Sequence, residues 1–262
     1  MRAFALALAI SLVLASAAEA APRRVASLNL CTDELLLVLG APEQIVSVTH
    51  LAQSPLETPY WQAARRYRRN DGTLADVAWL KPDLVLNMGG GARDRVQIAA
   101  KLGIQVIDIP YPRSIGDIEA SIRQVAAALG RPSAGRKLSS AIAMLKRTVP
   151  QRATETVWLG GGGRSVPGVG LASDWMRLAG MRQRSLVGDR ISLEQLVVSP
   201  PALLLRSDYR LGQYSGEQRW LRHPLAKHVR RSRSLVTDGR RWTCMGPSII
   251  PEILRLRREV VR

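Results

Sequence analysis

The sequence has few of the residues on which catalysis and metal binding usually depend. Its 262 residues include only two cysteines, three histidines, one phenylalanine and 21 acidic residues, against 38 lysines and arginines. His223 and His228 have no cysteine or acidic neighbour at metal-ligand spacing, so a bare zinc or manganese site is disfavoured. No G-x-S-x-G elbow and no H-E-x-x-H pair occurs, and the carboxylates show no paired arrangement. We therefore do not expect an enzyme.

Long apolar runs are also absent beyond the first 20 residues. Those residues contain one basic residue, Arg2, then an apolar run from Ala3 to Ala15, and then the small-residue exit Ala18-Glu19-Ala20. The run is shorter than the roughly 18 to 20 residues that a membrane-spanning helix needs. No cysteine lies at the predicted cleavage point to accept a lipid. Residues 1–20 are predicted to be a cleavable signal peptide, which indicates export to a Gram-negative periplasm.

Acidic residues are scarce enough to leave a formal net charge of +17. Such a balance is typical of chains that meet nucleic acid, anionic membrane surfaces or acidic small ligands. An exported protein rarely meets nucleic acid, so we expect no nucleic-acid partner. The arginine clusters are interpreted as solvated faces, with an anion-attracting cleft as the alternative.

Strand and helix patterns alternate along the chain, as in an α/β fold with parallel sheets. Short apolar runs predict strands, and 3.6-residue periodicity with N-caps and terminal glycines predicts helices. The predicted strands are Val25–Leu30, Ile45–Thr49, Leu84–Met88 and Gln105–Ile109. The predicted helices are Thr32–Leu39, Thr73–Leu80 and Arg93–Leu102.

An internal repeat indicates two lobes. TLADVAWLKPDLVL at residues 73–86 aligns without gaps on SLEQLVVSPPALLL at residues 192–205, and each copy places a capped helix before a proline and a buried strand. Between the copies, an apolar stripe predicts a helix about 25 Å long that begins near Ser133 and ends at Pro150. We expect an N-terminal lobe over residues 22–131, a linker helix over 132–149 and a C-terminal lobe over 150–262.

Six segments together resemble the periplasmic substrate-binding proteins of ABC importers for vitamin B12 and ferric siderophores, the helical-backbone class III type. They are SLNLCTDELLLVLG, VSVTHLAQSP, LADVAWLKPDLVLNMGG, LASDWMRLAGM, SLEQLVVSPPALLL and WTCMGPSII. The resemblance implies two Rossmann-like lobes joined by one long helix, with the ligand in the cleft between them. It implies a corrinoid or ferric-siderophore ligand, no cofactor, a monomer, and delivery to an inner-membrane ABC permease.

Two other functions stay open at this point. One is an exported α/β enzyme that uses a cleft cysteine, and the other is a basic binding protein of the envelope surface.

The resemblance also implies one acidic docking residue on each lobe. The second-lobe position matches Glu194, although an acid in the first turn of a helix also simply complements the helix dipole. The first-lobe position falls on Arg93, which departs from the family pattern, and Asp94 is the nearest acid.

Ligands of open α/β sheets meet the loops at the carboxyl ends of the strands. Tyr111 and Trp242 could supply aromatic faces, and Arg164 could meet a carboxylate or catecholate. His50 could coordinate the metal of a bound complex, or be an ordinary hydrogen-bonded loop histidine. The candidate ligand-binding residues in these loops are Cys31, His50, Met88, Tyr111, Arg164, Trp242 and Cys244.

The two cysteines have three possible roles. An even pair in an exported chain first suggests a disulfide, and a Cys31–Cys244 bond would tie the lobes across the cleft. The alternatives are two reduced thiols that touch the ligand, or two buried residues that never meet.

Overall fold

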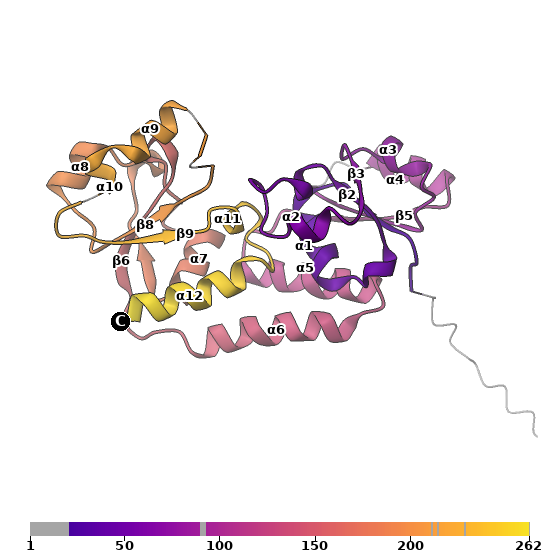
Figure 1. Ribbon diagram of the computed structural model, residues 1–262. Helices are drawn as coiled ribbons and strands as arrows, with labels where there is room; N and C mark the ends of the chain where they lie inside the picture. The colour runs from indigo at the N-terminus through magenta and orange to yellow at the C-terminus, as the bar shows by residue number, and fades with distance from the viewer. Residues whose placement is uncertain (1–20, 90–92, 211, 214, 228, 262) are drawn as a thin grey trace, which may run out of the picture.

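The computed structural model describes residues 21–261, apart from residues 90–92, 211, 214 and 228. The predicted signal peptide lies outside these described residues. Two α/β lobes lie side by side, and long helices run beneath both of them (Figure 1). No helix in the described part of the chain is long and apolar enough to cross a membrane.

The first lobe is built on a five-stranded sheet in the order β3-β2-β1-β4-β5, with every described pairing parallel. Strands β1 and β4 at its centre are buried along their whole length, as parallel strands covered on both faces require. The strands are β1 (Val25–Ser27), β2 (Ile45–Thr49), β3 (Arg68–Asn70), β4 (Leu84–Met88) and β5 (Gln105–Ile109).

The second lobe repeats this plan with a four-stranded parallel sheet in the order β7-β6-β8-β9. The order corresponds to β2-β1-β4-β5 of the first sheet, so the internal repeat covers the whole sheet and not only one helix and strand. The strands are β6 (Thr154–Leu159), β7 (Met181–Gln183), β8 (Leu203–Ser207) and β9 (Arg233–Thr237).

Helices and short 3-10 turns connect the strands. In the first lobe they are α1 (Leu30–Leu39), η1 (Pro42–Gln44), η2 (Leu51–Gln53), α2 (Trp61–Ala64), α3 (Leu74–Ala78), α4 (Arg93–Lys101) and α5 (Ile115–Ala128). Helix α6 (Pro132–Arg147) follows. The second lobe has η3 (Gly161–Gly163), α7 (Leu171–Leu178), η4 (Val187–Asp189), α8 (Leu193–Val198), α9 (Gly216–Arg222), α10 (Pro224–Lys227), α11 (Arg241–Cys244) and α12 (Ile249–Val261).

The repeated sequence forms equivalent units, α3-β4 and α8-β8. The Thr73 hydroxyl accepts a hydrogen bond from the Asp76 amide at 3.2 Å, and the Ser192 hydroxyl accepts one from the Gln195 amide at 3.2 Å. Each hydroxyl satisfies an amide that the first turn of its helix leaves without a partner. The helix α3 is therefore the first-lobe counterpart of α8.

Helices α5 and α6 approach each other closely at Gly135. A Cβ atom at this position would lie 2.6 Å from the Ala126 Cβ, so only glycine allows this spacing without a shift. Helix α12 returns along α6, where Arg257 donates to the Leu145 carbonyl at 2.9 Å and to the Leu178 carbonyl at 2.8 Å. These carbonyls lie in the last turns of α6 and α7, where a cation is favourable.

One hydrophobic core extends through both lobes. It includes the fully buried side chains of Leu36 in α1, Ile122 in α5, Leu145 in α6, Trp175 in α7 and Ile253 in α12. Separating the lobes would expose this shared core to water, at about 25 cal/mol per Å² of apolar surface. Large independent motion of the lobes is therefore unfavourable.

Candidate functional site

A disulfide joins Cys31 to Cys244, with the two Cα atoms 5.3 Å apart. Cys31 lies in the first turn of α1, where its amide donates to the side chain of the N-cap Asn29 at 2.8 Å. Cys244 is the last residue of α11. Both were expected in loops and both lie in helical turns. Of the three roles considered for the cysteines, the cross-lobe disulfide is the one observed.

Residues of both lobes line a small pocket beside this disulfide. Its volume is about 10 Å³, room for about one water molecule and far too little for a corrin or a porphyrin. Met88, at the end of β4, contributes to it, so the structure brings three of the seven candidate residues together. The lining residues are Cys31, Leu35, Met88, Ile118, Ser121, Cys244, Gly246 and Pro247.

Trp242 belongs to the core beneath this region. It is 6% exposed, its indole nitrogen donates to the Thr237 hydroxyl at 2.8 Å, and its ring centroid lies 6.1 Å from that of Trp158. A ring covered in this way has no open face for a ligand in this structure. Trp242 instead supports the turn that carries Cys244.

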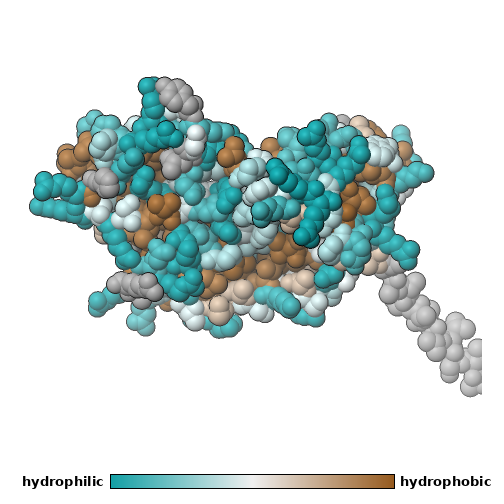
Figure 2. Space-filling model, viewed as in Figure 1, coloured by the Kyte–Doolittle hydropathy of each residue, from teal (hydrophilic) through white to brown (hydrophobic). Residues whose placement is uncertain are grey.

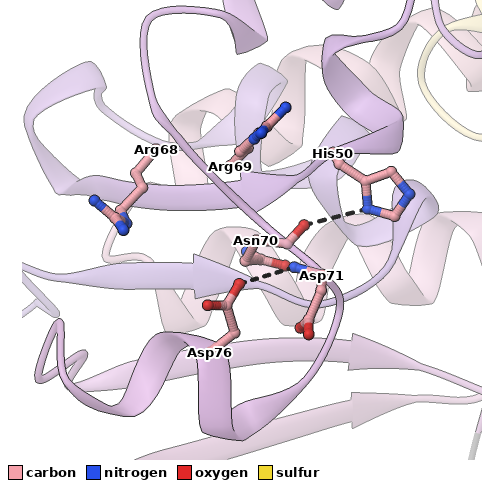
Figure 3. A pocket seen from close by; sticks show the side chains of 6 residues that line it. All are labelled: His50, Arg68, Arg69, Asn70, Asp71 and Asp76. Carbon is pink, nitrogen blue, oxygen red and sulfur yellow. Dashed lines mark hydrogen bonds between the residues drawn. The ribbon is translucent and has the colours of Figure 1, made fainter.

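His50 lies in an open pocket of about 630 Å³ formed by first-lobe residues (Figure 3). Its Nδ1 is 3.3 Å from the Asn70 carbonyl oxygen, which fits a hydrogen-bonded loop histidine. The pocket also holds arginines from β3 and carboxylates from the following loop and α3. The lining residues are His50, Arg68, Arg69, Asn70, Asp71 and Asp76.

Tyr111 and Arg164 are exposed at the carboxyl ends of β5 and of β6. Tyr111 packs over Gly89, where an added Cβ would lie 2.8 Å from the Tyr111 hydroxyl oxygen. Arg164 donates to Glu217 in α9 from Nη2 at 2.9 Å and from Nε at 3.1 Å. The structure does not bring either residue together with the disulfide.

Glu194 and Asp94 are the two acids expected to dock a permease. Glu194 is exposed in the first turn of α8, and hydrogen bonding to Ser192 and to the backbone lowers its pKa, so it is ionised at neutral pH. The side chain of Asp94 lies outside the described residues.

Polar contacts across the cleft are the feature that the sequence did not predict. Glu57, in the loop after η2, is 8% exposed, and its Oε2 accepts from the Tyr209 hydroxyl at 2.8 Å. Its Oε1 accepts from Nη2 of Arg210. Nearby, Arg240 Nη1 donates to the Pro55 carbonyl at 3.0 Å. These contacts fasten the first-lobe loop to two loops of the second lobe.

The cationic side of these contacts is itself held in place. Arg240 and Arg241 both bind Asp238, with nitrogen-oxygen distances of 2.8 and 3.1 Å. Burial works against the charge of Asp238, but these two guanidinium groups outweigh it and lower its pKa. The Arg210 guanidinium also lies over the Tyr209 ring, 5.2 Å from its centroid.

Helix α1 holds two buried carboxyls, Asp33 and Glu34. The Asp33 carboxylate accepts from the Thr49 hydroxyl at 2.5 Å and from its amide at 3.1 Å. Glu34 accepts from the Thr58 hydroxyl at 3.0 Å, and its Oε2 has no partner among the described residues. Burial raises the pKa of each carboxyl to about 7, against the lowering effect of these hydrogen bonds. Both groups therefore titrate near neutral pH.

The surface between the two lobes is hollowed. Figure 2 shows a notch there along the upper edge of the molecule. The loops that carry Glu57 and Tyr209 follow β2 and β8, and they join the two lobes.

The chain matches one family of known proteins. A family model described as periplasmic binding protein matches residues 25–231. A search of curated proteins gives no significant match.

Solved structures with similar folds include three from different bacteria. The periplasmic haem-binding protein RhuT from Roseiflexus sp. RS-1 is 22% identical with a TM-score of 0.65, covering 90% of this chain and 96% of its own. The vitamin B12-binding protein BtuF of Vibrio cholerae is 16% identical with a TM-score of 0.64, covering 90% and 96%. A periplasmic binding protein from Veillonella parvula is 13% identical with a TM-score of 0.67, covering 92% of each chain.

Proposed function

The chain belongs to the periplasmic binding protein family, and from this we propose that it captures a cobalamin-type or ferric-siderophore ligand between its lobes for an inner-membrane ABC permease. Members of this family bind solutes and are not enzymes. Proteins of similar fold include haem-binding and vitamin B12-binding proteins, so haem belongs among the candidates.

The observation that carries the proposal is the meeting of both lobes at the carboxyl ends of their parallel strands. Loops after β2 and β8 touch through Glu57, Tyr209 and Arg210, at the place where open α/β sheets bind ligands. A ligand there would replace protein contacts with its own, and the shared core beneath would keep the movement small. We assign residues 22–131 to the first lobe, 132–149 to the linker helix and 150–262 to the second lobe.

Several residues would shape the binding surface in this proposal. Cys31, Met88 and Cys244 would form its floor, while His50, Tyr111 and Arg164 would reach a ligand only at its edges. Trp242 would act indirectly, by supporting the floor. Arg210 and Arg240, which lie in the contacts between the lobes, favour an anionic iron complex over a neutral corrinoid.

We further propose that the permease docks on the surface around α3 and α8, which lie on the same upper side of the two lobes (Figure 1). Glu194 is the second-lobe acid. Because α3 is the counterpart of α8, the first-lobe position equivalent to Glu194 is Ala75, and the neighbouring Asp76 is a first-lobe candidate in addition to Asp94. Exchanging Glu194 for lysine should reduce cellular uptake of the ligand and leave its binding to the isolated protein unchanged.

The test of ligand binding is thermal unfolding of residues 21–262 with cyanocobalamin, cobinamide, haem and several ferric siderophores, each with and without reductant. A compound present at 100 times its Kd should add about 2.7 kcal/mol to the free energy of unfolding. A saturable rise in Tm for one compound identifies the ligand class. A panel without any rise would contradict the metal-chelate proposal.

A further inference from the structure

The contact made by Glu57 has the composition of a ligand-binding interaction. A carboxylate from one lobe is bound by a phenol hydroxyl and a guanidinium group from the other, and the residues are 152 and 153 positions apart in the chain. Arginine and tyrosine side chains arranged in this way recognise carboxylates in general, because charge-assisted hydrogen bonds are strong and directional. The second lobe therefore presents a carboxylate receptor to the cleft.

Glu57 does not engage every donor of this carboxylate receptor. The Arg210 Nε is buried and has no hydrogen-bond partner within the described residues, although Nη2 of the same group binds Glu57. A guanidinium group offers its donors as a planar fork that can hold both oxygens of one carboxylate. A buried donor without a partner is unfavourable, so a carboxylate that engaged Nε as well would bind better than Glu57 does.

Glu57 is also placed where it can move away. It belongs to a short turn, in which its own amide donates to the Ser54 carbonyl at 3.2 Å, and not to a helix or strand. The segment is fastened to the second lobe through Glu57 itself and through the Arg240 contact with Pro55. Replacing the Glu57 carboxylate would release one of these two attachments and allow the loop to part from Tyr209.

We propose that Tyr209 and Arg210 form a carboxylate subsite of the cleft, that Glu57 occupies it until a ligand carboxylate replaces it, and that the ligand is a metal chelate with at least one free carboxylate. The last part of this inference rests on the proposed transport function. Glu57 then acts as an internal competitor that rejects neutral chelates, which gain nothing by displacing it. Cyanocobalamin, whose corrin side chains are amides, should bind poorly for this reason.

The subsite can be tested without the natural ligand. Calorimetric titration with tricarballylate, a metal-free tricarboxylate, compares the unaltered protein with the Glu57→Gln and Glu57→Gln/Arg210→Gln variants. We expect Glu57→Gln to bind tricarballylate about tenfold more tightly, since the variant removes the negative charge that competes for Tyr209 and Arg210. The double variant should lose this gain. Glu119→Gln, which breaks the Lys146 ion pair away from the cleft, is the matched control and should leave binding unchanged.

A second pair of probes tests the ligand class. Haemin carries two free propionates, and its dimethyl ester carries none. Glu57→Gln should therefore improve the binding of haemin and leave the binding of the ester unchanged. Glu57→Asp keeps the charge on a shorter side chain and should give a smaller gain in haemin affinity than Glu57→Gln. It replaces Glu57→Gln in the test if that variant folds poorly.

The outcomes separate the two proposals. Equal tricarballylate affinity in the unaltered protein and Glu57→Gln would overturn the subsite. Tighter tricarballylate binding in Glu57→Gln, without binding of any chelate by any variant, would support the subsite and overturn the transport function. Equal gains for haemin and its ester would overturn the carboxylate requirement.

Discussion

Reducing the Cys31–Cys244 disulfide should lower the stability of the protein substantially. The bond connects residues 213 positions apart, so it restricts nearly the whole unfolded chain. The chain-entropy relation gives about 5 kcal/mol for a loop of this length, and for a protein of this size each kcal/mol shifts Tm by about 2 to 4 °C. We therefore expect reduction to lower Tm by about 10 to 20 °C.

The assay is thermal unfolding followed by circular dichroism, with and without a phosphine reductant, together with thiol titration to verify reduction. The Cys31→Ser/Cys244→Ser variant should melt near the reduced protein and should not respond to reductant. Because the hydrophobic core is shared by the two lobes, the reduced protein should still unfold in one transition. A decrease below about 3 °C, with both thiols free, would refute the chain-entropy reasoning.

Three further predictions concern other parts of the structure. Gly135→Ala should destabilise the protein by about 1 to 3 kcal/mol in chemical denaturation, because its Cβ would collide with Ala126, whereas Gly116→Ala, whose nearest neighbour would be 3.4 Å away, should be neutral or slightly stabilising. Trp242→Ala should cost about 3 to 5 kcal/mol through loss of core packing, and an unchanged stability would contradict its placement in the core. The folded state raises the pKa of Asp33 and Glu34 to about 7, so it holds protons that the unfolded chain releases near pH 4. The free energy of unfolding should therefore fall by a few kcal/mol as the pH rises from about 4 to 7 and then level off, and Glu34→Gln should flatten this dependence; a stability that rises over this range would contradict the assignment.

Three strands could be predicted from the sequence with the right bounds. The predicted bounds of Ile45–Thr49, Leu84–Met88 and Gln105–Ile109 agree with β2, β4 and β5, because parallel strands form short apolar runs. The predicted strand Val25–Leu30 was too long, since β1 ends at Ser27 and α1 begins at Leu30. The edge strand β3 was missed. Its sequence, Arg68-Arg69-Asn70, has no apolar run, since an edge strand near solvent needs none and charges there discourage pairing with other chains.

The site was predictable only in part. The Cys31–Cys244 disulfide was one of three roles that the sequence left open for its two cysteines, because the distance between them depends on how the two lobes pack. The Glu57 contact did not, because Glu57 and Arg210 resemble ordinary charged loop residues and nothing local indicates that they meet. Trp242 was expected to offer an aromatic face to a ligand, but its side chain packs against Trp158 in the core, a direction that a single sequence does not encode locally.

The long span of the disulfide also bears on how the protein matures. Cys31 precedes Cys244 by 213 positions, so the bond can form only after the second lobe has brought Cys244 to it. With only two cysteines in the sequence, no wrong intramolecular pairing exists, so maturation requires an oxidant and no isomerase. A disulfide between two molecules remains open to the chain, and it becomes more frequent when the second lobe folds slowly.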